Sequence, residues 1–568
     1  MALARQSSGL STGPHAGEVL VSVAGSFIPA SLFRKRSASV AAIKALEWHQ
    51  APAAPDPLVP PARRKLTIMS NRPDRHRVLI VLFDGLRPDL VKPSLTPNLI
   101  RLQRRGAVLA RQRTVYPSET RIALTSLITG ATPDRHGIVG NQYLDRHLPA
   151  PRLVDTSDAG LIEQLDAASG GHLLGVPSLG EILAANGKTL SVLASNSPGA
   201  TRLLNHKARK LGQLTLSGHF PCIATSAEML RQVETLLGPT PAPPPLGTPD
   251  LASQAFLTSA FLDVIWPQIR PDVTILSFGE PDNSSHVNGT GARKTLEAIS
   301  FVDRQFGRVL DWWEAEGVYQ GVHLIAASDH GHVTVHGRAD LFETLGAVGL
   351  RCGPALATGI DAIVIPGQVG AIYLAEPSQS VIRRAVGAMI ERPWCGPVFT
   401  VGGAVNGIAP GSFARQLVFA DHARSADILF SFRSDGGLDP FGLIGRSWSA
   451  DGPVGFGVHG GLHAKEMSSV GILAGPLVKD GFVSKVPSNI CDFAPSVLNL
   501  LGISRPATMT GRALTEVFIH QGGDVPRPIE NVYETSSGAY RQHLRRVQVG
   551  GAVYLDSADV VDRLNNQA

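Results

Sequence analysis

Cysteine is scarce in this chain of 568 residues. There are four cysteines, they are widely spaced, and none forms a CxxC pair. Such spacing indicates buried or reduced thiols and argues against a disulfide framework. We therefore favour the cytoplasm as the compartment, with secretion or the periplasm as the alternative.

Long apolar runs are missing as well. The apolar stretch at residues 19–33 is short for a membrane span, contains Pro29, and is followed by the basic residues Arg34–Arg36. A signal peptide carries its basic residues before the apolar region, whereas here they follow it, so this stretch does not have the pattern of a signal peptide. We expect no membrane span.

Charge is sparse and unevenly distributed. Charged residues make up 17% of the chain and hydrophobic residues 43%, which indicates a globular protein. Residues 1–68 carry eight basic and three acidic residues, an excess of five that equals the net charge of +5. The remainder is neutral, which argues against a nucleic-acid partner. With the proline-rich stretch Ala51–Ala62 and Met69 just beyond, residues 1–68 are predicted to be a disordered leader or an over-extended gene start.

Strand-like and helix-like stretches alternate, which predicts an α/β fold with a mostly parallel sheet. Three apolar runs have the length of buried strands: Val78–Phe83, Val273–Phe278 and Val322–Ala327. An acid follows each of them: Asp84, Asp282 and Asp329. An acid at the end of such a strand points into the crevice where ligands bind, or it caps the next helix or turn.

Three histidines accompany these acids. His286 lies four residues after Asp282, so both would share one face of a helical turn. His330 follows Asp329 directly, and His459 lies in the glycine-rich segment GFGVHGGLH. Three carboxylates and three imidazoles suit two divalent cations, and these ligand types favour Zn²⁺.

Other histidines are nearby. His463 is a rival ligand to His459 from the same segment. His332 and His336 follow the Asp-His pair and are expected to lie at the surface or behind the ligands.

A hydroxyl completes the set. Thr120 follows the turn-forming sequence YPSE and precedes residues 122–128, which are predicted to be helical. A helix N-terminus favours an anion, and a cation beside the hydroxyl would activate it for attack on phosphorus. An ordinary capping threonine is the alternative.

With these segments in place, the chain resembles the alkaline phosphatase superfamily, in its nucleotide pyrophosphatase/phosphodiesterase branch. VLIVLFDG, YPSETR, HGIVGN, EPDNSSH, SDHG and the late His-Gly occur in the order of that family, between about Val78 and Phe518. The resemblance implies a three-layer sandwich with a mostly parallel central sheet and a smaller cap insertion. It assigns the catalytic core to residues 69–342 and 451–523 and the cap to 343–450. The remaining residues 524–568 form a tail, where the spacing of Arg541, Arg545 and Arg546 suggests a helix with a solvated face.

The resemblance also implies roles for the residues. One cation is held by Asp84, Asp329 and His330, with Thr120 as nucleophile. The other is held by Asp282, His286 and His459, which is why His459 is preferred over His463. Asn141, in HGIVGN, corresponds to an amide that donates to a phosphoryl oxygen.

One stretch departs from the phosphomonoesterases of this superfamily. Where they place a Lys and an Arg two residues apart, this chain has Ser195 and Ser197. A monoester dianion would lose charged contacts there, although Lys207, Arg209 and Lys210 lie close in sequence.

The expected function is hydrolysis of a phosphodiester or nucleotide pyrophosphate, with a phosphothreonine intermediate and a small phosphate ester or nucleotide as substrate. The alternatives are a phosphonate hydrolase of the phosphonoacetate type, a phosphomonoesterase, and an inactive scaffold stabilised by metal.

Overall fold

The computed structural model describes residues 75–146, 148, 151–367, 369–520 and 526–561. It also describes the backbone of a hairpin formed by β1 (Leu20–Val23) and β2 (Ser26–Pro29). The chain divides into two compact units, Met1–Arg72 and Pro73–Ala568. Apart from the hairpin, the leader predicted for residues 1–68 lies outside the described residues and stays a prediction.

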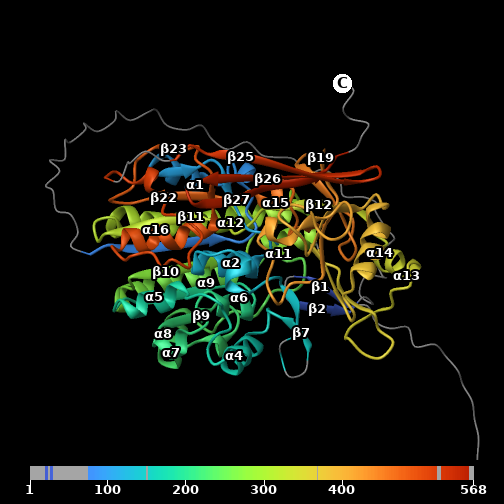
Figure 1. Ribbon diagram of the computed structural model, residues 1–568. Helices are drawn as coiled ribbons and strands as arrows, with labels where there is room; N and C mark the ends of the chain where they lie inside the picture. The colour runs from blue at the N-terminus through green and yellow to red at the C-terminus, as the bar shows by residue number, and fades with distance from the viewer. Residues whose placement is uncertain are drawn as a thin grey trace, which may run out of the picture. The chain divides into compact units, whose positions relative to one another are not determined.

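The second unit is built around an eight-stranded sheet (Figure 1). Its strand order is β23 (Phe482–Ser484), β4 (Ala107–Leu109), β22 (Gly471–Ala474), β11 (Val322–Ala327), β3 (Arg77–Phe83), β10 (Val273–Phe278), β8 (Leu190–Ala194) and β9 (Leu214–Ser217). The five strands from β11 to β9 are parallel, and β22 runs antiparallel to both of its neighbours. The predicted strands Val78–Phe83, Val273–Phe278 and Val322–Ala327 are confirmed as β3, β10 and β11.

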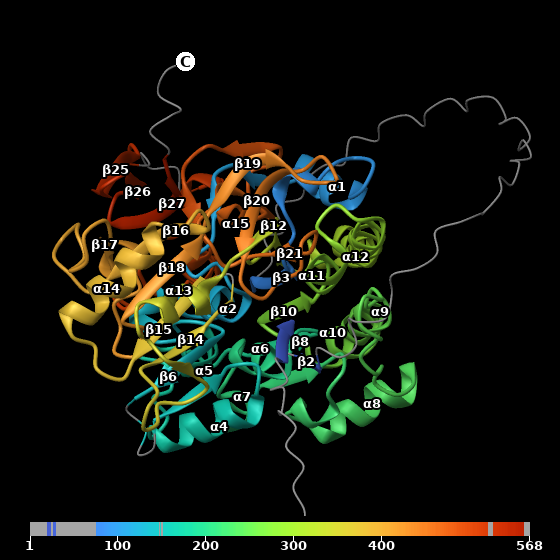
Figure 2. The same cartoon turned by 90° about the vertical axis from the view of Figure 1, so that its right-hand side faces the viewer.

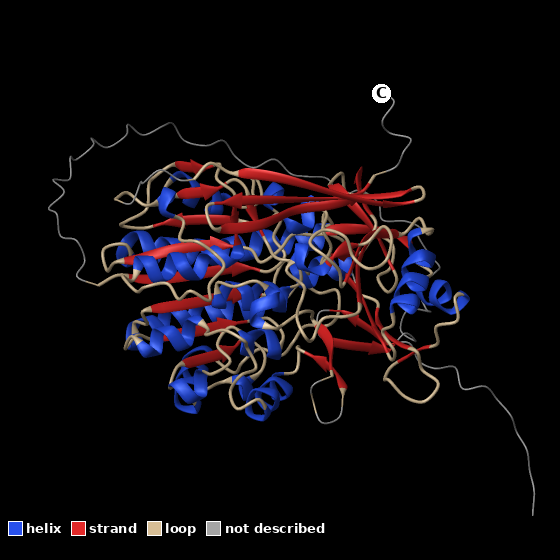
Figure 3. Cartoon of the chain, in the orientation of Figure 1, coloured by secondary structure: helices blue, strands red, loops and turns tan. Residues whose placement is uncertain are grey.

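Both faces of this sheet are buried, which explains why its strands are apolar without alternation. On β3, Val78, Ile80 and Leu82 pack into one core, and Leu79, Val81 and Phe83 pack into the other. The first core includes side chains of α2 (Thr120–Thr129), α5 (Leu179–Ala185), α6 (Pro198–Leu203) and α16 (Phe493–Leu500). The second includes side chains of α1 (Pro97–Arg104), α9 (Ala252–Ser259) and α12 (Arg293–Trp312). The predicted α/β sandwich of helix, sheet and helix layers is confirmed, and Figure 3 shows the strands between helices.

Further helices complete the layers and the connections. They are α3 (Pro133–His136), α4 (Ala159–Ala168), α7 (Ala208–Leu211), α8 (Ala227–Leu237), α10 (Trp266–Ile269), α11 (Asp282–Asn288) and α15 (Ala464–Met467). A two-stranded ribbon, β6 (Gln142–Asp145) with β7 (Arg152–Asp155), follows Asn141.

Residues 343–450 contain a second sheet of their own. Its order is β13 (Cys352–Gly353), β14 (Ala362–Ile365), β15 (Val369–Leu374), β18 (Ile428–Phe432), β16 (Cys395–Thr400) and β17 (Phe413–Ala414). Helices α13 (Leu341–Ala347) and α14 (Gln379–Ile390) share a core with it (Figure 2). The insertion is thus a layered element with its own core, whose role as a cap stays a prediction.

A third sheet brings two distant segments together beside the main sheet. It has the order β19 (Ser434–Leu438), β20 (Ile444–Ser449), β12 (Val333–Arg338) and β21 (Gly457–Val458). In its antiparallel β12–β21 ladder, Val333 pairs with Val458. Extending this register by one residue places His332 opposite His459.

The helix expected in the C-terminal tail is wrong. Residues 529–560 form an antiparallel sheet of β25 (Ile529–Ser537), β26 (Tyr540–Val549) and β27 (Ala552–Val560). On β26, Tyr540, Gln542 and Leu544 are buried and alternate with half-buried residues, which is the period of a strand. Burial of one face of the sheet outweighed the helical spacing of the arginines.

Two expectations about absences can be compared with the described residues. All four cysteines are free thiols. Among the described helices, none is both long enough and apolar enough to cross a membrane.

Candidate active site

The candidate site lies at the carboxyl ends of four neighbouring parallel strands. Asp84 directly follows β3, Asp329 follows β11, Asp282 opens the helix after β10, and Asn196 follows β8. Adjacent parallel strands end at one edge of the sheet, so the fold gathers these side chains in a single crevice.

The first group contains the hydroxyl. The Oγ1 atom of Thr120 lies 3.1 Å from His330 Nε2 and 3.4 Å from Asp84 Oδ1. His330 Nε2 in turn lies 3.4 Å from Asp84 Oδ1 and 3.4 Å from Asp329 Oδ2. All four side chains are buried.

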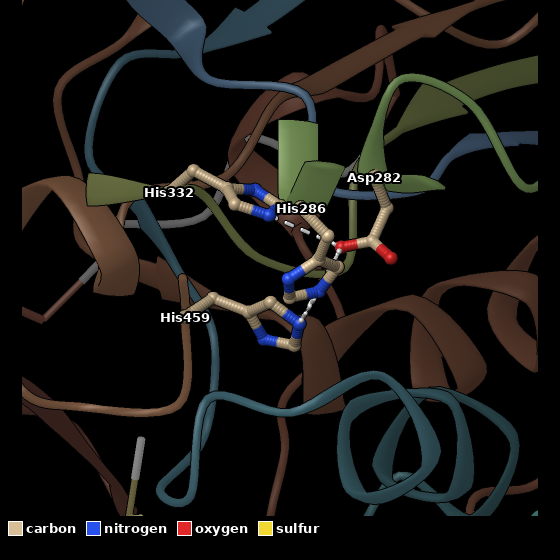
Figure 4. A group of neighbouring side chains, drawn as sticks. All are labelled: Asp282, His286, His332 and His459. Carbon is tan, nitrogen blue, oxygen red and sulfur yellow. Dashed lines mark hydrogen bonds and ion pairs between the residues drawn. The ribbon is translucent and has the colours of Figure 1, made fainter. Parts of the chain in front are cut away.

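The second group surrounds Asp282. Its Oδ1 atom lies 3.3 Å from His286 Nε2 and 3.4 Å from His459 Nε2, and these two nitrogens are 3.0 Å apart (Figure 4). Asp282 also lies within reach of Asp84 and His330, so the two groups are adjacent. The predicted pair of Asp282 and His286, four residues apart on one helical turn, is found at the start of α11.

Backbone carbonyls fix the orientation of the imidazoles. The Nδ1 atoms of His286, His330 and His459 lie 3.0, 3.1 and 2.9 Å from the carbonyl oxygens of Gly457, Gly331 and Ser118. A carbonyl oxygen only accepts, so each Nδ1 carries the proton and each Nε2 presents its lone pair to the crevice. This arrangement is typical of histidines that bind a metal.

The carboxylates also fit divalent cations. Asp329 Oδ1 accepts from the backbone N–H groups of Gly85 and His330 at 3.0 Å, whereas Oδ2 is buried and accepts no hydrogen bond from the described residues. Burial, followed by the nearby charges of Asp329 and Asp282, raises the pKa of Asp84 well above its usual range. Three buried carboxylates this close together repel one another, and two bound cations would compensate that charge.

Thr120 is the first residue of α2, a helix whose residues are all buried. The N-terminal N–H groups of this helix therefore lie beside the hydroxyl, where they favour an anion. Asn141 lies next to this end, since its Oδ1 atom accepts from Arg121 N at 3.4 Å. Its backbone N–H donates to Glu119 Oε2 at 2.6 Å, which anchors the loop and leaves the side-chain NH₂ group for another acceptor.

Residues 78–379, more than half of the chain, match the family of type I phosphodiesterases and nucleotide pyrophosphatases. The chain belongs to this family. It is the nucleotide pyrophosphatase branch of the alkaline phosphatase superfamily, as the sequence predicted. The matched range contains every predicted site residue except His459.

The relatives in this family are distant. The chain is 23% identical over 261 residues to mouse ectonucleotide pyrophosphatase/phosphodiesterase family member 3, covering 45% of this chain and 24% of that relative. It is 25% identical over 272 residues to mouse family member 7, covering 47% of this chain and 53% of that relative. The chain therefore matches only about a quarter to a half of the length of these relatives.

Solved structures of the family share the fold. Murine ectonucleotide pyrophosphatase/phosphodiesterase 5 superposes with a TM-score of 0.53 at 17% identity, covering 78% of this chain and 100% of that one. An inactive threonine-to-alanine variant of that protein in complex with AMP gives a TM-score of 0.52 at 18% identity, covering 76% and 96%.

Asn196 contacts a predicted ligand but was not identified from the sequence. Asn196 donates from Nδ2 to Asp84 Oδ2 at 2.6 Å, and its Oδ1 atom accepts from the Ser277 hydroxyl at 2.6 Å. Its position just after β8 is the same signal that identified Asp84, because both follow an apolar strand. Asn196 therefore orients the Asp84 carboxylate toward the crevice.

We expect Asn196→Ala to lower kcat/KM and the affinity for divalent cations by about 10–100-fold, the usual cost of losing a partner that orients a ligand. Metal content after dialysis and steady-state kinetics would measure this loss. Asn186→Ala is the matched control, because that amide donates only to the carbonyl oxygen of Ile182 within its own helix. Equal zinc content and rate in both variants would show that Asp84 needs no such support.

The remaining histidines separate clearly. His463 caps α15, where its Nδ1 atom accepts from Lys465 N at 3.2 Å, so the preference for His459 agrees with the geometry. His336 packs against Trp448 away from the crevice. His332, however, is 0% exposed and its Nε2 atom lies 3.2 Å from Asp282 Oδ1, so the expectation of a surface position is wrong for it.

The two serines in the departing stretch do not face the crevice. The Ser195 hydroxyl donates to Gln254 Oε1 at 2.9 Å, and Ser197 caps α6 by accepting from Ala200 N at 3.4 Å.

The nearby basic residues have acidic partners elsewhere. Lys207 lies 2.6 Å from Glu181, Arg209 lies 3.5 Å from Glu163, and Lys210 lies 3.0 Å from Asp166. Their charges therefore join α7 and its first flanking residue to α4 and α5.

Proposed function

We propose that this chain hydrolyses a phosphodiester or a nucleotide pyrophosphate bond, with Thr120 as the nucleophile and Asn141 as a donor to the phosphoryl group. The observation that carries the proposal is the position of Thr120 Oγ1, 3.1 Å from His330 Nε2 and 3.4 Å from Asp84 Oδ1 at the N-terminus of α2. A buried hydroxyl placed against a carboxylate and an imidazole lone pair is suited to lose its proton and attack.

Six side chains would hold two divalent cations of the zinc type. One group is Asp84, Asp329 and His330, with Thr120, and the other is Asp282, His286 and His459. When bound, such cations supply positive charge that lowers the pKa of a hydroxyl and stabilises phosphoryl oxygens.

In the first step the Thr120 hydroxyl releases its proton to solvent, and its oxygen forms a bond to phosphorus as the bond to the leaving oxygen breaks. The leaving alcohol or phosphate departs with the electron pair of that bond and gains a proton from solvent. The Asn141 NH₂ group and the N–H groups at the start of α2 donate to the nonbridging oxygens as their charge develops. Water then attacks the phosphothreonine from the opposite side, which restores the Thr120 hydroxyl and releases the product.

A trapping experiment tests the covalent step. The enzyme is mixed with an excess of an activated aryl diester, quenched in acid within milliseconds, and digested. Mass spectrometry should find the phosphoryl group on the peptide that contains Thr120. A burst of leaving group without modification of that peptide would assign the attack to water or to another residue.

Substrate class follows from charge. Ser195 and Ser197 are engaged in the fold, and Lys207, Arg209 and Lys210 are paired with acids. The crevice therefore lacks the Lys and Arg that monoesterases use at this place. A diester monoanion needs these contacts less than a monoester dianion does.

We expect a diester to exceed its matched monoester in kcat/KM by about tenfold or more, since each charged hydrogen bond contributes roughly 1.5–3 kcal/mol. Steady-state kinetics on aryl esters with one leaving group would measure the ratio. Because a relative in this family is known in complex with AMP, a nucleotide ester belongs in the same panel.

One observation supports the alternative substrates. Arg121 follows Thr120, and its buried guanidinium donates from Nε to Thr156 Oγ1 at 2.8 Å while lying 3.8 Å from Asp155. A monoester or phosphonoacetate preference of about tenfold or more would overturn the diesterase proposal and assign the extra substrate charge to Arg121.

A further inference from the structure

His332 shares the chemical state of the proposed metal-binding histidines. Its Nδ1 atom lies 3.2 Å from the carbonyl oxygen of Gly85, as the Nδ1 atoms of His286 and His459 lie 3.0 and 2.9 Å from theirs. Since a carbonyl oxygen only accepts, the proton of His332 resides on Nδ1. The lone pair on Nε2 therefore points at Asp282, into the second group (Figure 4).

The spacing of the four donor atoms matches a tetrahedral cation. Asp282 Oδ1 lies 3.2 Å from His332 Nε2, 3.3 Å from His286 Nε2 and 3.4 Å from His459 Nε2. The nitrogens of His286 and His459 are 3.0 Å apart, and all four atoms lie within 4.8 Å of one another. Zinc bonds of about 2.0–2.2 Å in a tetrahedron place the donor atoms about 3.3–3.6 Å from each other.

The burial of His332 Nε2 and Asp282 Oδ1 favours a cation bound between them. His332 is 0% exposed, and neither its Nε2 atom nor Asp282 Oδ1 has a hydrogen bond of ordinary geometry to any part of the chain that the structure describes. Two buried acceptors that face each other at 3.2 Å repel, and each loses the water that would have satisfied it. A cation bound by both atoms removes this cost.

We propose that His332 is a fourth protein ligand of the second cation, donating the lone pair of Nε2 beside Asp282, His286 and His459. The inference rests on the two-cation site of the proposed function. It makes the second site a closed one of one carboxylate and three imidazoles, because four protein donors complete a tetrahedral zinc site. The first group also offers four donors, but one of them is the Thr120 hydroxyl, which is the proposed nucleophile.

The direct test is a crystal structure of the zinc-loaded wild-type protein, with zinc located by anomalous scattering. We expect a distance of about 2.0–2.1 Å between His332 Nε2 and the zinc beside Asp282. A distance beyond about 3 Å, with His332 donating to Asp282 instead, would overturn the proposal. Zinc position does not depend on turnover, so this result is separate from the phosphothreonine experiment.

Zinc affinity provides the second measurement. In competition with a chromophoric chelator, His332→Gln should raise the dissociation constant of one of the two zinc ions by at least about tenfold and leave the other nearly unchanged. His336→Gln is the matched control, since that ring lies four residues further along the chain, on β12, where it packs against Trp448. Equal affinities in the two variants would contradict the assignment, as would a protein that binds no zinc.

Discussion

Thr120→Ala should lower kcat by at least about 10³-fold, because removing the nucleophile of a covalent hydrolase costs several orders of magnitude in rate. The change deletes one hydroxyl and one methyl group from a residue that is 8% exposed, while the Asp and His side chains of both groups remain. Steady-state kinetics on an aryl diester measures the loss. Zinc content and melting temperature should stay close to those of the wild type.

Thr120→Ser is the matched control for this substitution. It keeps the oxygen that lies near His330 Nε2 and Asp84 Oδ1, so part of the activity should survive. If Thr120→Ala instead turned over diesters at the wild-type rate, Thr120 would have only a structural role at the start of α2, and another group would be the nucleophile.

Removal of divalent cations should abolish hydrolysis and destabilise the fold. Without them, Asp84, Asp282 and Asp329 remain buried close together, and the raised pKa of Asp84 reflects both burial and this repulsion. Elemental analysis after mild dialysis should find close to two zinc-class ions per chain, from the two groups of donors. Chelation should then lower activity by at least about 10³-fold, and added Zn²⁺ should restore it.

The melting temperature supplies an independent readout of the same step. A ligand that binds only the folded chain stabilises it by RT ln(1 + [L]/Kd), so added zinc should raise the melting temperature in proportion to the logarithm of its concentration. A metal-free protein with full activity would contradict the proposed chemistry altogether.

The central sheet and much of the site could be predicted because the same sequence pattern marks the strands and the site residues that follow them. In β3, β10 and β11, an apolar run ends abruptly in a polar residue, and this contrast marks both the strand and its functional end. Asn196 follows the same pattern after β8, but a neutral amide marks a functional strand end less distinctly than a carboxylate does.

Other features depend on partners that are remote in the sequence. Nothing near His332 shows that the Gly85 carbonyl would orient its ring toward Asp282, since that contact joins residues 247 positions apart. The prediction of a helix in the C-terminal tail was wrong for a related reason. Its arginines fit a helix locally, but Tyr540, Gln542 and Leu544 are buried on one face of a sheet that packs against the rest of the second unit.

The short ladder between β12 and β21 controls the spacing of two imidazoles that belong to segments far apart in the chain. Val333 pairs with Val458, so His332 and His459 are cross-strand neighbours, and their ring centroids lie 4.9 Å apart. A slip of one residue in the register of β21 would turn its side chains to the other face of the sheet. Val458 or Gly460 would then lie opposite His332 in place of His459. A single residue added between Val458 and His459 would therefore rotate a donor away from Asp282.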